Sequence, residues 1–186
     1  MNVNFQTAGK GGKAATVEWY TPREIIKPLG PFDLDPATSL EAISLNNSAK
    51  HYYTQKDNGL LKPWFGRVWL NPPYKNPDIR LFMQKMAEHG NGIALVFNRC
   101  DSSWFQDYVL GRADAIMFLR KRIRFLRPDG TQGDSPGAGS ILIAYGSQNV
   151  ESLARCRLAG KLVRMDSVTK SNIQLGLNFS SITERS

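Results

Sequence analysis

The chain has 186 residues, of which 41% are hydrophobic, and a formal net charge of +8. This length suits one domain with a substantial core, and no apolar run approaches the roughly 20 residues of a membrane-spanning helix. The two cysteines stand outside any Cys-x-x-Cys pair or Cys/His cluster, so we expect reduced thiols and no metal site. Residues 120–170 carry ten basic and four acidic side chains. This local excess favours a polyanionic partner, with a merely solvated basic surface as the alternative.

The first expected elements follow a polar segment. Residues 1–17 are glycine-rich, lack periodicity and lack the apolar stretch of a secretory signal, so we expect a flexible N-terminal arm. The sequence that follows predicts a helix with Thr21 as its N-cap and Glu24 completing a capping box. Pro28 and Gly30 keep this helix short.

A brief strand and a second helix are expected next. Residues 32–35 predict a strand that ends at Pro36, because proline cannot donate a hydrogen bond to a sheet. Thr38 and Glu41 form a second capping box, which predicts a helix that continues to about residue 50. The expected inner face of this helix carries Leu40, Ile43 and Leu45.

The rest of the chain alternates between strands and helices. Strands are predicted at 51–54, 66–70, 93–97, 113–119, 123–126 and 141–145, and helices at 77–89, 102–110 and 149–159. This alternation indicates an α/β fold with a mostly parallel central sheet. The last three strands leave no room for helices between them, which indicates antiparallel pairing at one edge. We therefore expect one compact domain over residues 18–146 and a C-terminal extension over residues 147–186.

The predicted strand at 66–70 stops at Asn71-Pro72-Pro73-Tyr74. Two prolines end the strand and hold an amide and an aromatic ring on a stiff turn. In open α/β sheets, ligands bind at the carboxyl ends of strands. Such a turn suits methyl transfer to an aromatic amine, whose lone pair is delocalised into its ring. The Asn71 side-chain oxygen and the Pro72 carbonyl can accept hydrogen bonds from this amine, and an exposed Tyr74 offers a stacking face.

The tetrapeptide resembles the (Asn/Asp/Ser)-Pro-Pro-(Tyr/Phe/Trp) motif of S-adenosylmethionine-dependent amino-methyltransferases. Further matching segments are Trp19-Tyr20-Thr21-Pro22, Asp33-Leu34-Asp35-Pro36-Ala37, Asp57-Asn58-Gly59-Leu60, Asn98-Arg99-Cys100-Asp101 and Arg122-Ile123-Arg124-Phe125. Over residues 18–145 the chain therefore resembles the phage-type DNA N6-adenine methyltransferases of the Dam family.

The resemblance implies a Rossmann-like methyltransferase fold, S-adenosylmethionine as the cofactor and double-stranded DNA as the partner. It also implies direct methyl transfer to a flipped adenine, usually within GATC, without a metal. The expected catalytic residues are Asn71, Pro72, Pro73 and Tyr74. We expect the protein in the cytoplasm of a bacterium or of a phage-infected host.

Two segments resemble the cofactor-binding parts of this family. Tyr20, Thr21 and Pro22 match a segment that closes over the methionine part of the cofactor, and Asn71 is expected to contact the cofactor from the catalytic turn. For Thr21, a plain helix cap is the alternative, and both roles are compatible.

Acidic residues mark the rest of the expected cofactor pocket. Asp35-Pro36-Ala37 stands where many methyltransferases have a glycine-rich turn, and Asp35 can bind the ammonium while N–H groups near Ala37 bind the carboxylate. Asp57 lies 22 positions later and can bind a ribose hydroxyl or the adenine amine. The alternative is that Asp35 and Asp57 only stabilise turns.

The densest basic run, residues 120–127, holds five cations in eight positions. Ile123 and Phe125 alternate with arginines, which predicts a strand with one charged face. This strand either contacts DNA or is an edge strand protected by charge. The expected DNA contacts are Arg122, Arg124, Arg127, Lys75 and Arg99.

Other readings stay open at this point. The fold can serve as a catalytically inactive nucleic-acid-binding module, or as a methyltransferase acting on RNA or on protein glutamine. Trp104 can line the base pocket or, as is more usual for tryptophan on an amphipathic helix, pack in the core. The sequence leaves the oligomeric state open.

Overall fold

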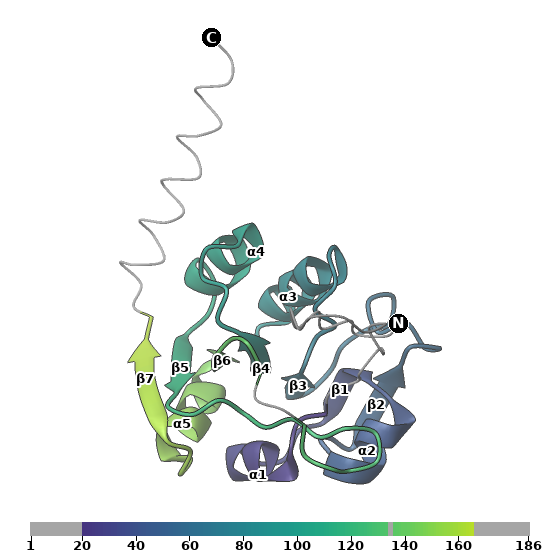
Figure 1. Cartoon of the computed structure of the whole chain (residues 1–186). Coiled ribbons are helices and arrows are strands. Elements are labelled where there is room, and N and C mark those ends of the chain that lie inside the picture. Colours follow the sequence, from purple (N-terminus) through teal and green to yellow (C-terminus); the bar gives the residue numbers. More distant parts are fainter. Residues whose placement is uncertain (1–19, 134–135, 166–186) are drawn as a thin grey trace, which may run out of the picture.

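The computed structural model describes residues 20–133 and 136–165, so the expected N-terminal arm lies outside the described part. Within that part, one seven-stranded sheet has the order β2-β1-β3-β4-β6-β5-β7 (Figure 1). Its strands are β1 (Leu34–Thr38), β2 (His51–Thr54), β3 (Val68–Leu70), β4 (Gly92–Phe97), β5 (Ala115–Leu119), β6 (Ser140–Tyr145) and β7 (Gly160–Arg164).

The two halves of the sheet pair differently. β2, β1, β3 and β4 are parallel to one another, whereas β6 is antiparallel to both β4 and β5, and β7 is antiparallel to β5. The expected α/β architecture with antiparallel pairing at one side of the sheet is therefore confirmed. The sheet is less parallel than expected, because three of its six strand pairs are antiparallel. The carboxyl ends of the four parallel strands meet along one edge of the sheet.

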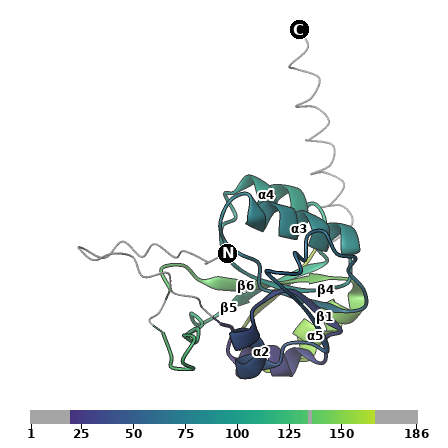
Figure 2. The ribbon, with the colours of Figure 1, turned by 90° about the vertical axis from the view of Figure 1, so that its right-hand side faces the viewer.

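Helices cover both faces of the sheet. They are α1 (Arg23–Ile26), the 3-10 turn η1 (Lys27–Leu29), α2 (Leu40–Asn46), α3 (Asp78–His89), α4 (Ser103–Phe105), the π-helical η2 (Gln106–Leu110) and α5 (Ser147–Arg155). Figures 1 and 2 show α3 and α4 on one face and α1, α2 and α5 on the other. The result is a three-layer arrangement, which explains why the central strands are apolar throughout.

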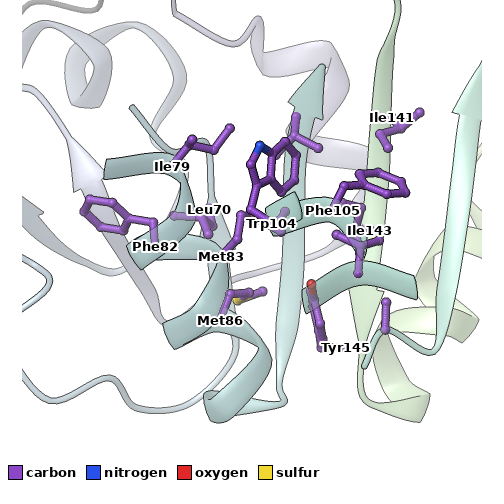
Figure 3. Close-up of a cluster of buried hydrophobic side chains, with 14 of the residues drawn as sticks. Leu70, Ile79, Phe82, Met83, Met86, Trp104, Phe105, Ile141, Ile143 and Tyr145 are labelled. Carbon is purple, nitrogen blue, oxygen red and sulfur yellow. The ribbon is translucent and has the colours of Figure 1, made fainter. Parts of the chain in front are cut away.

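The alternation of β4 divides the core into two clusters. Ala94 and Val96 pack under α3 and α4, whereas Ile93 and Leu95 pack toward α1 and α5. In the first cluster, Trp104 lies with α3 side chains over the sheet (Figure 3) and is 6% exposed. Trp104 therefore belongs to the core and not to a base pocket.

The first capping prediction is wrong. α1 begins at Arg23 with Pro22 in the N-cap position, and no side chain caps it. Thr21 Oγ1 instead accepts a hydrogen bond from Asn71 Nδ2 at 3.3 Å. A partner 50 residues away has thus replaced the local cap.

Pro36 does not end β1, which continues to Thr38. The register with β2 shifts between Asp35 and Thr38. Such an irregularity tolerates proline, because the missing N–H is not needed for the ladder at that point.

The second helix also differs from its prediction. Its cap is Ser39, whose Oγ accepts from the Ala42 N–H at 3.2 Å. The helix ends at Asn46 and not near residue 50, because Asn47 adopts the left-handed conformation. Its buried residues are Ala42 and Asn46, and Leu40 is 71% exposed, so the expected inner face is wrong.

Residues 123–126 do not form a strand of the sheet. Ile123 and Phe125 are buried as the alternation predicts, but Leu126 makes only isolated antiparallel bridges to Tyr20 and Gln132. The free edge of β5 is instead covered by β7, which the sequence did not predict. Both α5 and β7 follow residue 146 and join the same sheet and its helical layer.

A buried arginine connects the ends of several elements. Arg67, immediately before β3, is 6% exposed. Its Nε donates to Asn149 Oδ1 at 2.6 Å, and its two terminal nitrogens donate to the Pro31 and Leu29 carbonyls at 3.0 and 2.8 Å. The guanidinium also lies over the Phe32 ring, 4.4 Å from its centroid. Arg67 therefore joins η1, β1 and α5 to the start of β3.

Replacing Arg67 with lysine should destabilise the fold. A single ammonium cannot reproduce the fork that serves three acceptors, and each buried acceptor left unpaired costs about 1–3 kcal/mol. Chemical denaturation measures the loss. Arg80→Lys on the exposed side of α3 is the matched control and should change the free energy of unfolding by less than about 0.5 kcal/mol. An Arg67→Lys loss as small as the control would contradict the prediction.

Candidate active site

A cavity of about 410 Å³ opens at the carboxyl ends of the parallel strands. Each of the four strands contributes to it: Pro36 to Ser39 from β1, Gln55 after β2, Asn71 to Tyr74 after β3, and Phe97 from β4. This is the edge at which open α/β sheets bind ligands. The expected catalytic turn and most of the expected cofactor residues therefore share one cavity.

Hydrogen bonds fix the orientation of the Asn71 side chain. Its Nδ2 donates to Thr21 Oγ1 at 3.3 Å, and its Oδ1 lies 3.4 Å from the Tyr74 hydroxyl. These two contacts hold the amide between Thr21 and Tyr74, with its oxygen on the Tyr74 side. An amide oxygen has two lone pairs, so Oδ1 can accept one further hydrogen bond from a ligand in the cavity.

Tyr74 is half-buried, not exposed as the sequence suggested. Its hydroxyl also lies 3.3 Å from the Leu95 carbonyl oxygen, and burial raises the pKa of this phenol well above its ordinary value. The ring packs against Phe97 with centroids 4.6 Å apart, and Phe97 contacts Phe125 edge-on at 6.0 Å. All three rings line the cavity, so one part of it has aromatic walls suited to a planar base.

Asp35 gives another part of the cavity a negative charge. It is 4% exposed, and its oxygens accept from Ser48 Oγ at 2.5 Å and from the Ala37 N–H at 3.2 Å. Burial raises the pKa of Asp35 from 3.8 to about 6, although both hydrogen bonds oppose this shift. No cation pairs with Asp35 among the residues that the structure describes.

Asn46 adds a second acceptor beside Thr21. Its Nδ2 donates to the Thr21 carbonyl at 3.2 Å, whereas its buried Oδ1 has no hydrogen-bond partner within residues 20–133 and 136–165. Asn46 and Asp35 both line the cavity. An ammonium group would satisfy this pair of acceptors, so the residues fit the amino-acid end of an S-adenosylmethionine-like molecule.

Tyr20 joins the cavity to the basic segment. Its hydroxyl accepts from Ser39 Oγ at 3.2 Å, and its backbone exchanges two hydrogen bonds of 2.8 Å with Leu126. Pro22, the next residue but one, lies outside the cavity at the start of α1. Tyr20 and Thr21 therefore reach the site, and Pro22 does not.

The loop after β2 places Asn58 in the cavity but leaves Asp57 outside it. Asp57 Oδ2 accepts from the Thr54 N–H and Oγ1, both at 2.8 Å, and these bonds lower the pKa of Asp57. Gly59 lies so close to β1 that an added Cβ would come within 2.0 Å of the Pro36 carbonyl oxygen. Glycine is required there because the two backbones are in contact.

The expected DNA contacts do not line the cavity, but each lies within three residues of a cavity residue in the sequence. Lys75 follows the catalytic turn and Arg99 follows β4, and both are exposed. In the basic segment Arg124 is exposed, whereas Arg122 Nη1 donates to the Pro136 carbonyl at 2.9 Å and Arg127 is half-buried. Phe125 of the same segment lines the cavity, so the backbone of this segment borders the aromatic part of the cavity.

Several cavity residues were missed by sequence reasoning. They are Asn46, Thr54, Leu60, Asp78, Phe82, Phe97 and Phe125. Asn46 and Asp78 lie on helices, where polar residues ordinarily indicate solvent exposure. Phe97 carried a usable signal, because it is the last residue of an apolar strand whose carboxyl end was expected at the site.

The cavity lies at the carboxyl ends of the strands and is lined by an Asn-Pro-Pro-Tyr turn and a buried carboxylate. This combination is typical of the amino-methyltransferase class. A family model described as DNA N-6-adenine-methyltransferase (Dam) matches residues 10–156. The chain therefore belongs to the Dam family.

One curated relative extends this result. A DNA N-6-adenine-methyltransferase of Escherichia phage T1 is 39% identical over 109 residues, which cover 53% of this chain and 43% of the relative. The chain thus spans less than half the length of that relative. No solved structure matches this chain.

Two further structural findings concern the described residues alone. Within them, no helix has both the length and the apolar character needed to cross a membrane. The same ranges contain no cluster of three or more His, Cys, Asp or Glu side chains arranged to hold a metal ion.

Asp35→Asn should remove a pH dependence of stability. The native state binds the Asp35 proton more tightly than the unfolded chain, so this carboxyl contributes stability at pH 4 that is lost as pH rises through about 6. A pKa raised from 3.8 to about 6 corresponds to about 3 kcal/mol, so the free energy of unfolding of Asp35→Asn should exceed that of wild type by up to this amount at pH 8. Urea denaturation of both proteins from pH 4 to 8 measures the difference. Parallel pH profiles for the two proteins would contradict the prediction.

Proposed function

We propose that this protein is an S-adenosylmethionine-dependent DNA methyltransferase that modifies N6 of adenine. The observation that carries the proposal is that Asn71 and Asp35 line one cavity at the carboxyl edge of the sheet. One residue suits the amine that receives the methyl group, and the other suits the ammonium of the donor. The parallel strands followed by antiparallel ones support a Rossmann-like methyltransferase fold.

The catalytic turn acts on the amine through hydrogen-bond acceptors. Asn71 Oδ1 and the Pro72 carbonyl oxygen accept from the two N–H groups of adenine, which localises the nitrogen lone pair toward the methyl donor. Thr21 and Tyr74 hold the Asn71 amide in place, and the second lone pair of its oxygen would accept from the substrate. The new nitrogen–carbon bond forms as the sulfur–carbon bond breaks, and one amine proton is released to water.

The donor site depends on Asp35 and Asn46. When bound, S-adenosylmethionine supplies an electrophilic methyl group on its sulfonium. Asp35 and the unpaired Asn46 Oδ1 hold the ammonium end of this molecule, and Tyr20 and Thr21 cover it from the N-terminal side. The charged donor also offsets the cost of burying the Asp35 carboxylate.

The substrate base must leave the duplex to reach this turn. Asn71 and Pro72 lie in a cavity whose aromatic walls are Tyr74, Phe97 and Phe125, and a base inside a duplex cannot enter such a space. We therefore propose base flipping, with the flipped adenine stacked among these rings. GATC is the target that the family resemblance implies.

Substitution of Asn71 tests the catalytic assignment. Asn71→Ala removes the side-chain acceptor and should lower the rate of methyl transfer by about 10²-fold or more. Asn71→Asp keeps an acceptor at this position and should retain measurable transfer. The assay follows radiolabelled methyl groups from S-adenosylmethionine into unmethylated duplexes with and without GATC.

The outcomes of this assay separate the possible substrates. Label on adenine N6 that disappears only in Asn71→Ala supports the proposal and shows whether GATC is required. Labelling of RNA or of protein glutamine in place of DNA would overturn the choice of substrate. A protein that binds S-adenosylmethionine but labels none of these substrates would be a binding module with this fold.

We further propose that the basic segment 120–127 contacts DNA phosphates. Arg124 is exposed, and the segment borders the aromatic part of the cavity through Phe125. Arg122 is anchored to the Pro136 carbonyl by one nitrogen, which leaves its other N–H donors available. Arg127 is half-buried and lies near Asp129, so its share of the phosphate contact is expected to be smaller.

Arg124→Ala should weaken DNA binding in a salt-dependent way. Loss of one phosphate contact reduces the slope of log affinity against log salt concentration by about 0.9. Fluorescence anisotropy with a labelled duplex at several salt concentrations measures this slope. The control is Arg112→Ala. Arg112 is exposed and precedes β5, at the end of the sheet opposite the cavity. Equal slopes for wild type and Arg124→Ala would contradict the assignment.

A further inference from the structure

Asp78 has an unexplained buried oxygen in the cavity wall. It is the first residue of α3, is 9% exposed and lines the cavity. Its Oδ2 is buried without a hydrogen-bond partner among residues 20–133 and 136–165. Buried acceptors in native proteins are normally paired, and an unpaired one costs about 1–3 kcal/mol. An unpaired carboxylate oxygen at a cavity therefore indicates the position of a donor on the ligand.

Two apolar side chains line the cavity together with Asp78. Leu60, from the loop after β2, and Phe82, one turn further along α3, line the same cavity. Both side chains belong to the core cluster on the α3 face, and Trp64 packs against Phe82 with centroids 6.3 Å apart. One hydrogen-bond acceptor beside two apolar side chains suits a flat heteroaromatic ring that carries an amino group.

The loop and the helix that form this subsite are fastened together. Lys85 Nζ, on α3, donates to the carbonyls of Gly59, Leu60 and Lys62 at 3.3, 2.6 and 2.6 Å. Gly59 in turn lies against the Pro36 backbone of β1. Leu60 is thus held in place relative to α3, so the subsite is formed before a ligand binds.

We propose that Asp78 Oδ2 accepts a hydrogen bond from the exocyclic amine of the cofactor's adenine, whose ring lies between Leu60 and Phe82. This inference rests on the proposed use of S-adenosylmethionine. It assigns to Asp78 the amine recognition that the sequence suggested for Asp57, which the structure leaves outside the cavity.

The position of the subsite favours the adenine of the cofactor over the target adenine. The two differ in source but present the same amine. Leu60 and Phe82 pack with the core cluster on the α3 face, whereas Phe97 and Phe125, beside the catalytic turn, pack with the cluster on the opposite face. The target base needs Asn71 and therefore occupies the aromatic part, which leaves the α3 side to the cofactor.

A carboxylate at this point makes the site selective for an amine. Hypoxanthine has a carbonyl oxygen where adenine has the amine. This oxygen and the Asp78 oxygen are both acceptors, so no hydrogen bond could form between them. A site that hydrogen-bonds an N–H group rejects analogues that lack it, because its own polar group is then left unpaired. Asp78→Asn can rotate its amide to donate to the carbonyl oxygen, so this variant should tolerate hypoxanthine.

Direct binding measurements without DNA test the proposal. Calorimetry would compare S-adenosylhomocysteine with S-inosylhomocysteine, its hypoxanthine analogue, for wild type and Asp78→Asn. We expect wild type to prefer the adenine form by about 10²-fold and Asp78→Asn to narrow this ratio to about 10-fold or less. The control is Glu88→Gln, which removes the same charge from an exposed position on the same helix and should keep the wild-type ratio.

Each contrary outcome has a distinct meaning. A wild type that binds both compounds equally, or an Asp78→Asn variant that retains the wild-type ratio, would overturn the proposal while leaving the methyltransferase assignment intact. If Asp78→Asn altered only the choice of target base in the transfer assay, with cofactor ratios unchanged, Asp78 would read the target adenine instead. A wild type that binds neither compound would overturn the proposed function itself.

Discussion

The position of β3 depends on the buried guanidinium of Arg67. β3 has three residues, and its paired register with β1 consists of Leu34 opposite Val68. The Asp33 and Leu34 N–H groups both donate to the Arg67 carbonyl, and the guanidinium fixes η1 and α5 by three further hydrogen bonds. Burial lowers the pKa of Arg67, and the nearby Asp33 opposes this shift. Among the described residues, the guanidinium hydrogen-bonds only to neutral acceptors, which are an amide oxygen and two backbone carbonyls. Because β3 is so short, the contacts at its amino end also determine where its carboxyl end presents Asn71.

The parts of the fold that follow periodic patterns were predictable from sequence. α3 was expected from helical spacing and lies within one residue of its predicted start, with Gly90 in the left-handed conformation after its end. β4 was expected from a continuous apolar run, and it is buried along its whole length. The turn after β3 was predictable because two prolines after an apolar strand have few structural alternatives.

The remaining features depended on long-range partners. Thr21 has the sequence context of a helix cap, but its hydroxyl oxygen accepts a hydrogen bond from Asn71 instead. A partner so distant in sequence cannot be predicted from local sequence patterns. Segment 123–126 has a strand-like alternation, but strand formation also needs a neighbour, and β6 and β7 occupy both sides of β5. Asn46 and Asp78 were missed because a polar residue on a helix becomes a site residue only when the fold turns it toward a cavity. Asp57 was expected in the pocket from its sequence spacing, yet its carboxylate accepts a hydrogen bond from the Thr54 N–H in a local turn.

The two backbone hydrogen bonds between Tyr20 and Leu126 connect the proposed cofactor site with the proposed DNA-binding segment, which are far apart in sequence. Tyr20 lines the cavity beside Asp35, and Leu126 lies between the arginines of the basic segment. If the cofactor and DNA bind as proposed, a ligand that orders one side of this bridge would also order the other side, and the two binding events would share a coupling free energy. By thermodynamic reciprocity, any gain in DNA affinity caused by the bound cofactor equals the gain in cofactor affinity caused by bound DNA. Under the proposed function, the bridge would therefore couple cofactor binding to DNA binding through two backbone hydrogen bonds.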